Sequence, residues 1–287
     1  MPRPLRYQPS EWAPVFVTNR CFQSRMLLRP SPRLNQLVTG IIARALNMYE
    51  VKLYGLCVMS NHYHMLLAPK NAQHLASFMQ YVDRNISDEV GRLNHWPGTF
   101  WARRYRASVV LDQDALMDRM KYIFANSVKE GLVRHPRYWP GIHCYQALAD
   151  KRPLNGIWIN RTRWCQNRDL HLSEVTTRHT LKFDKLPGYE HFTDYEYAQH
   201  MRELAKHALC EWPAPENVLG QKRIMAVEPH SQPKESAKHP APLCHTTCQE
   251  KRTEFIAAFK EFVGAYQEAF DQFRRTVLNT AFPHGGI

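Results

Sequence analysis

The sequence predicts an α+β fold in which an antiparallel sheet carries helices on one face. Two observations favour it. Short apolar segments with strand character recur through the first half of the chain, and helical segments whose apolar residues recur every three or four positions separate them. With the helices on one face, the opposite face of the sheet is expected to be free to carry a site.

Each predicted element follows from its own pattern. The helix at 32–49 has apolar residues at helical spacing, and the apolar segments at 51–58 and 62–68, separated by Ser60 and Asn61, suit an antiparallel pair. In chain order the expected elements are a strand at 15–22, a helix at 32–49, strands at 51–58 and 62–68, a helix at 72–93, a strand at 105–111, and a helix from a cap at Asp112 or Asp114 to 127.

Beyond the first domain, assigned to residues 10–145, the pattern weakens. Residues 146–227 are expected to form an irregular, partly helical extension, with helical character at 194–210. Residues 228–249 are rich in Pro, His, Ser and Lys and predict a flexible linker. Aromatic residues at steps of three and four then predict a C-terminal amphipathic helix within 250–282, which suits docking or self-association.

The chain is strongly basic. Its formal net charge is +12, and residues 1–150 hold 19 Lys and Arg against 10 Asp and Glu. This balance favours a polyanionic partner, with nucleic acid the first candidate, although many basic proteins have no such partner.

Seven scattered cysteines without regular spacing argue against a disulfide framework. The N-terminal residues lack the apolar core of a signal peptide, and no apolar run approaches the length of a membrane span. A reduced, cytoplasmic location without membrane contact is the expectation.

His62 and His64 stand one residue apart inside an apolar run with strand character. Side chains at i and i+2 of a strand share a face, so the two imidazoles project together while Tyr63, Met65 and Leu67 face the other way. Such a pair can supply two ligands of a metal site. Two histidines that are only hydrogen-bonded or exposed to solvent are the alternative.

Tyr122 and Asn126 lie one turn apart on the helix predicted to end near residue 127. An amide oxygen can be a third metal ligand, and a tyrosine hydroxyl can act as a covalent nucleophile. A tyrosine in a helix is more often a partly buried packing residue.

Three motifs in order carry a resemblance to a known family: Asn-His-Tyr-His at 61–64, WARRYRASVV at 101–110 and YIFANSVKEGLV at 122–133. Together they resemble the single-tyrosine HUH transposases, and within them the REP-associated tyrosine transposases, over about residues 10–145. Ser127 stands where that family usually has proline, and only a local change at the helix end is expected.

The resemblance implies a ferredoxin-like, RRM-like sheet and a metal-dependent transposase that nicks and joins single-stranded DNA. It assigns His62, His64 and Asn126 as ligands of Mg²⁺ or Mn²⁺ and Tyr122 as the nucleophile. Tyr122 would form a 5′-phosphotyrosine and free a 3′-hydroxyl at hairpin-forming repeats. It further implies a prokaryotic, nucleoid-associated protein that works as a monomer or a homodimer.

Basic residues near the predicted site are candidates for DNA contact, with stacking of bases on a tyrosine as in other single-strand binders. A basic sheet edge with a packed tyrosine is the alternative. The candidates are Arg20, Arg103, Arg104, Tyr105 and Arg106, followed by Arg134, Arg137 and Tyr138–Pro140.

Three alternatives stay open. Cys244, His245 and Cys248 offer three soft ligands, one short of a typical zinc site. The chain could be a domesticated DNA-binding protein that keeps the fold but does not transpose. It could also be an RNA-binding sheet domain with aromatics on its open face, against which the paired histidines argue.

Overall fold

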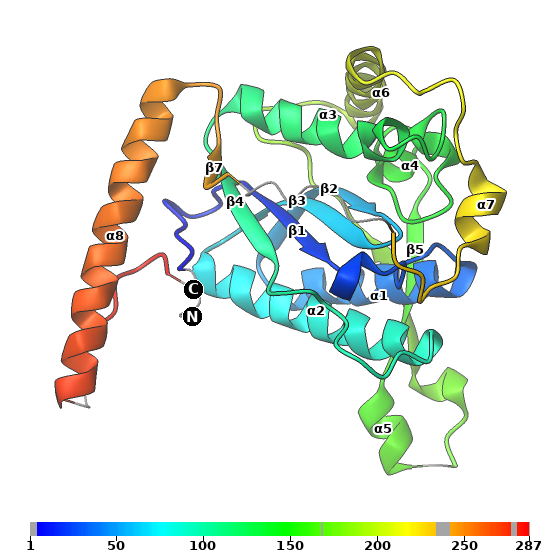
Figure 1. Ribbon diagram of the computed structural model, residues 1–287, viewed down its shortest axis with the longest axis horizontal. Coiled ribbons are helices and arrows are strands. Elements are labelled where there is room, and N and C mark those ends of the chain that lie inside the picture. Colours follow the sequence, from blue (N-terminus) through cyan, green and yellow to red (C-terminus); the bar gives the residue numbers. More distant parts are fainter. Residues whose placement is uncertain (1–4, 168, 234–241, 277–279, 287) are drawn as a thin grey trace.

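A computed structural model describes residues 5–167, 169–233, 242–276 and 280–286. Its central sheet has the order β2–β3–β1–β4–β7 (Figure 1). These strands are β1 (Val15–Arg20), β2 (Val51–Val58), β3 (His62–Pro69), β4 (Arg106–Val110) and β7 (Cys244–His245). A second, two-stranded sheet consists of β5 (Leu154–Ile159) and β6 (Thr176–Leu181). The helices are α1 (Pro32–Met48), α2 (Ala72–Leu93), α3 (Gln113–Lys129), α4 (Cys144–Leu148), α5 (Arg161–Gln166), α6 (Asp194–Glu211), α7 (Gln221–Ala226) and α8 (Gln249–Thr276).

The first six elements of this core form a ferredoxin-like β–α–β–β–α–β unit. β1 lies between β3 and β4 and is antiparallel to both, and β2 is antiparallel to β3. The predicted fold class, an α+β antiparallel sheet followed by a mainly helical C-terminal extension, is confirmed. The predicted start of α3 is also confirmed, since the carboxylate of Asp112 accepts a hydrogen bond from the backbone N–H of Ala115 (2.8 Å).

The alternation of side chains along the strands divides the core into two layers. Val17 of β1 and Met65 of β3 pack with α1 and α2 on one face, whereas Phe16 and Leu66 pack on the other. Tyr63 also faces α2, where its hydroxyl donates to Asp83 (2.5 Å). The expectation that Tyr63, Met65 and Leu67 turn away from the two histidines is therefore confirmed.

The second face of the sheet is not left open, contrary to the expectation. α3 lies across it, and α6 packs on the outer side of α3 (Figure 1). Leu116, Met120 and Ile123 of α3 are buried against this face together with Phe16. The apolar stripe of α3 needs a surface to cover, and this face of the sheet provides it. Any site on this face must therefore lie where α3 meets the strands.

The region 146–227 contains a β-hairpin that the sequence reading missed. β5 and β6 pair antiparallel and pack on α1 through a very close backbone contact. A Cβ added to Gly156 would lie 2.1 Å from the backbone nitrogen of Gly40, and one added to Gly40 would lie 2.1 Å from the carbonyl oxygen of Ile157. Only glycine at both positions allows the hairpin to approach the helix so closely.

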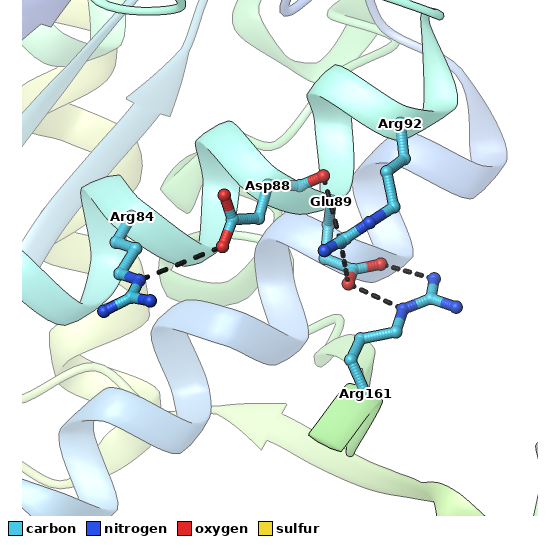
Figure 2. Close-up of polar contacts among 5 residues, drawn as sticks. All are labelled: Arg84, Asp88, Glu89, Arg92 and Arg161. Carbon is cyan, nitrogen blue, oxygen red and sulfur yellow. Dashed lines mark hydrogen bonds and ion pairs between the residues drawn. The ribbon is translucent and has the colours of Figure 1, made fainter. Parts of the chain in front are cut away.

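A buried carboxylate fixes α5 to α2 beside this hairpin. Glu89 accepts two hydrogen bonds from Arg161 of α5 (2.8 and 2.6 Å) and one from Arg92 (2.8 Å), as Figure 2 shows. Its side chain is 9% exposed. On the same helix, Asp88 and Arg84 form a long, solvent-exposed pair at 4.0 Å.

We predict that Glu89→Ala lowers the free energy of unfolding by about 2 kcal/mol, because it leaves two guanidinium groups without their buried partner. The exposed pair supplies the control, and Asp88→Ala is expected to change stability by less than about 0.5 kcal/mol. Urea denaturation followed by circular dichroism measures both. Equal effects of the two substitutions would show that Glu89 does not hold α5.

The C-terminal part of the chain corrects the linker prediction. Within the expected flexible linker 228–249, residues 244 and 245 form β7, which pairs in parallel with β4. Residues 234–241 of that linker lie outside the described residues. The predicted C-terminal helix is observed as α8, which ends at Thr276 and contacts Tyr7 through Phe255 and Phe262. Over the residues described, none of the helices is both long and apolar enough to span a membrane.

Candidate functional site

His62 and His64 project from β3 toward the face covered by α3, and their ring centroids lie 4.8 Å apart. Strand pairing sets Thr18 of β1 opposite His64 and Arg20 opposite His62. The pair is thus fixed on a central strand of the sheet, and the predicted common orientation of the two imidazoles is observed.

Both histidines are held through Nδ1. His62 Nδ1 donates to the side-chain oxygen of Asn61 (2.6 Å), which leaves its Nε2 without a proton. His64 Nδ1 lies 2.8 Å from Thr18 Oγ1, and its Nε2 is buried with no hydrogen-bond partner among the described residues. An imidazole held at Nδ1 by an oxygen, with Nε2 left free, is the arrangement of metal-binding histidines.

The protonation state of the pair also suits a ligand. Burial lowers the pKa of His62 to about 3, with the charge of Arg20 acting in the same direction. Burial, His62 and two arginines likewise hold the pKa of His64 well below its usual value. Both imidazoles are therefore neutral near pH 7, and the neutral form is the one that binds metals.

α3 brings Tyr122 against this pair. The ring of Tyr122 meets that of His64 edge to face, with centroids 5.2 Å apart, and meets that of Phe16 at 5.9 Å. Burial raises the pKa of Tyr122, an effect to which Glu130 adds and which the charge of Arg119 opposes. A phenol in this position must lose its proton before or during any attack it makes.

Asn126 lies one turn beyond Tyr122 and is 2% exposed. Both polar atoms of its side chain are buried and find no hydrogen-bond partner within the described ranges. A buried amide left unpaired is costly, and a bound ligand would relieve that cost. Two imidazoles and an amide oxygen form a mixed nitrogen and oxygen set that suits a divalent cation such as Mn²⁺ or Mg²⁺.

The unpaired atoms of His64 and Asn126 have the donor chemistry that a divalent cation needs, and the amide would be the third ligand. In the part of the chain that the structure describes, no group of three or more His, Cys, Asp or Glu side chains could hold an ion. The amide ligand expected from the motif is thus required for a three-ligand site here.

Arg119 is a residue of this site that the sequence reading missed. Its guanidinium carbon lies 5.4 Å from the centroid of the Tyr122 ring and 5.7 Å from that of Phe16. The signal was present in the sequence, because Arg119 precedes Tyr122 by three positions on one helix and so shares its face.

The predicted DNA contacts divide into two groups. Arg20, Arg103, Arg104 and Arg106 are exposed, and the charge of Arg20 reaches His62 and Tyr122. Tyr105 is a correction. It is 5% exposed and packs in the layer of α1 and α2 beneath the guanidinium of Arg6, 3.7 Å from its ring centroid. Its burial and the guanidinium over one face of its ring argue against a role as a stacking platform.

Two weaker candidates are also resolved. Arg137 is paired with Asp150 through two hydrogen bonds (2.9 and 2.6 Å), and Trp139 is buried and donates to the carbonyl of Val58. These interactions give both residues structural roles.

The zinc alternative fails on orientation. Cys244 packs in an apolar cluster with Val109 and Phe255, whereas the next residue, His245, lies against the ring of Phe16. Successive side chains of a strand point to opposite faces, so Cys244 and His245 cannot share one ion.

Comparison with known proteins agrees with the resemblance predicted from the motifs. Residues 21–126 match the family model described as Transposase IS200 like. Over 102 residues the chain is 24% identical to a protein of Haemophilus influenzae assigned as a REP-associated tyrosine transposase. The aligned part is 32% of this chain and 58% of that protein, so the chain spans little more than half the length of this curated relative.

Two solved structures are also similar. A REP-associated tyrosine transposase bound to a REP hairpin matches with 16% identity and a TM-score of 0.44, covering 53% of this chain and 86% of that one. A protein of Deinococcus radiodurans described as a transposase matches with 15% identity and a TM-score of 0.31, covering 43% and 95%.

Proposed function

Since residues 21–126 match the IS200-like transposases, we propose that this domain cleaves and rejoins single-stranded DNA through Tyr122. The observation that carries the proposal is the contact between Tyr122 and His64, with ring centroids 5.2 Å apart. A candidate nucleophile thus lies beside a neutral imidazole pair, and Nε2 of His64 is buried without a hydrogen-bond partner among the described residues.

In the proposed reaction, Tyr122 Oη attacks the phosphorus of a phosphodiester. The bond from phosphorus to Tyr122 forms as the bond to the 3′ oxygen breaks. The phenol gives up its proton, and the released 3′ oxygen takes one to become a hydroxyl. The DNA 5′ end stays linked to the enzyme as a phosphotyrosine, so a 3′-hydroxyl can reverse the step and rejoin a strand.

A divalent metal, Mg²⁺ or Mn²⁺, would be held by His62, His64 and Asn126. When bound, it supplies positive charge that polarises the scissile phosphate. The chain's own contribution is orientation: Asn61 and Thr18 hold the two imidazoles, and α3 fixes Tyr122 against one of them.

A hairpin-forming single strand is the proposed substrate. The relative solved with a REP hairpin supports this choice of DNA as a test substrate. The exposed arginines at 20, 103, 104 and 106 supply the positive charge that a DNA backbone needs near the site.

The proposal is tested by incubating the protein with end-labelled hairpin DNA carrying a single-stranded flank. In Mn²⁺ we expect a protein–DNA band that survives denaturing electrophoresis, with a free 3′-hydroxyl on the released strand. Fully duplex DNA and a reaction with chelator are the controls. Absence of the band with a panel of hairpins would instead favour a DNA-binding protein that does not transpose.

The contact between Thr18 and His64 leads to a prediction about metal affinity. Thr18→Val keeps the shape of the side chain but removes the oxygen 2.8 Å from His64 Nδ1. Loss of such an orienting contact is expected to weaken metal affinity about 10- to 100-fold. The measurement is the Mn²⁺ concentration that gives half-maximal adduct.

The matched control is Thr176→Val at the start of β6, which removes a hydroxyl that donates to the carbonyl of Leu172 (2.6 Å). It is expected to leave the Mn²⁺ requirement unchanged. An unaltered requirement in Thr18→Val would mean that Thr18 does not orient a ligand.

A further inference from the structure

The C-terminal segment brings one more side chain to the face that carries Tyr122. His245 of β7 is joined to β4, since its carbonyl accepts a hydrogen bond from the N–H of Leu111 (2.9 Å). Just beyond it, the N–H of Thr247 donates to the carboxylate of Asp112 (2.9 Å), the residue that caps α3. The segment is thus fixed to the start of the helix that carries Tyr122.

Phe16 is the point at which the side chains of this face meet. Its ring, 8% exposed, lies edge to face with those of His245 (5.6 Å) and Tyr122 (5.9 Å) and stacks on that of His64 (5.3 Å). The guanidinium carbon of Arg119 lies 5.7 Å from its centroid. His245 and Arg119 therefore border the same ring as the candidate nucleophile.

Arg119 carries a charge that no salt bridge within the described residues neutralises, although the Asp118 carboxylate favours its charged form. Its Nε is buried without a hydrogen-bond partner, and it forms no ion pair in the described ranges. The adjacent Asp118 pairs with Lys121 instead (2.8 Å). A partly buried guanidinium without a hydrogen-bonded anion is unfavourable, and a phosphate is an anion that its planar donors can bind in a bidentate way.

His245 complements this cation without adding charge. Burial lowers its pKa to about 4, and Arg119 acts in the same direction, so the imidazole is neutral near pH 7. No hydrogen bond to its ring nitrogens occurs within the described parts of the chain, and one nitrogen of a neutral imidazole carries a proton to donate. A phosphate oxygen could accept that proton's hydrogen bond.

We propose that Arg119 and His245 form a phosphate-binding subsite beside Tyr122, which takes a backbone phosphate of single-stranded DNA. The inference rests on the proposed function, because the phosphate belongs to the strand that Tyr122 attacks. It makes the C-terminal strand part of the DNA-binding face.

The salt dependence of DNA binding tests the role of Arg119. Each phosphate contact contributes about 0.7 to the slope of log affinity against log salt for a single strand. With a fluorescent hairpin DNA in metal-free buffer, Arg119→Gln is expected to make the slope shallower by about 0.7, and Arg119→Lys to retain it. Arg202→Gln, an exposed arginine on α6, is the matched control and should leave the slope unchanged.

His245→Gln tests the second member of the subsite. It should weaken binding about fivefold, the equivalent of one hydrogen bond, without changing the slope. His207→Gln, at an exposed position of α6, should have no effect. Circular dichroism shows whether each variant is folded. Because His245 lies on an edge strand, His245→Gln is expected to fold, so its DNA affinity still tests the subsite if Arg119→Gln does not fold.

The two proposals can fail separately. A wild-type protein that binds DNA but forms no adduct would refute the proposed function. The salt dependence of DNA binding would still test the phosphate subsite. A folded, adduct-forming Arg119→Gln with wild-type slope and affinity would refute the subsite alone.

Discussion

Tyr122→Phe is expected to reduce covalent DNA adduct by at least about 10³-fold, because it removes the oxygen that forms the bond to phosphorus. The ring remains, so its contacts with His64 and Phe16 are kept. The tyrosine hydroxyl makes no hydrogen bond among the described residues, and stability should change little. Denaturing electrophoresis measures the adduct, and fluorescence anisotropy should show unchanged DNA affinity.

Tyr54→Phe is the matched control for this substitution. Tyr54 is a buried tyrosine that packs on the same face of the sheet with α3, and it lies outside the proposed chemistry. It should form adduct at the wild-type level. An adduct that persists in Tyr122→Phe, mapped by mass spectrometry to another residue, would reassign the nucleophile.

His64→Ala is expected to lower metal-dependent cleavage at least about 100-fold, since loss of a ligand should exceed the effect of losing only its orienting partner. DNA affinity without metal should stay within about threefold, because the imidazole is neutral and contributes no charge to phosphate binding. Cleavage across a Mn²⁺ titration and anisotropy without Mn²⁺ measure the two quantities.

His207→Ala on the exposed face of α6 controls for loss of an imidazole elsewhere. It should cleave and bind as the wild type does. If His64→Ala lost DNA affinity as severely as cleavage, the histidine would be a DNA contact or a support of the fold, and a metal role would not be needed.

The parts of the site that could be predicted from sequence obey short-range periodicity. The period of two along β3 placed His62 and His64 on one face, and helical spacing placed Asn126 one turn from Tyr122. The same rule could have corrected Tyr105, which shares the α1 and α2 side of β4 with Ala107. Counting the alternation of side chains outward from the centre of β4 predicts that the ring of Tyr105 points into the core.

Contacts between distant segments could not be read in this way. Thr18 meets His64 only because β1 lies beside β3, and His245 meets Phe16 only because β7 joins the far side of β4. A strand of two residues is too short to show a periodic pattern, so β7 could not be told apart from the surrounding residues, which have the composition of a linker. The β5–β6 hairpin was missed for a related reason, since its close approach to α1 depends on two glycines far apart in sequence, Gly40 and Gly156.

The distance along the chain between Asp112 and the C-terminal segment has a consequence for biosynthesis. The hydroxyl of Thr246 donates to the carboxylate of Asp112 across 134 positions. Tyr122 is synthesised roughly 120 residues before β7, and His64 earlier still. At about 5–20 residues per second this is an interval of about 6–24 s. A nascent chain thus carries the histidine and tyrosine side chains several seconds before it gains His245.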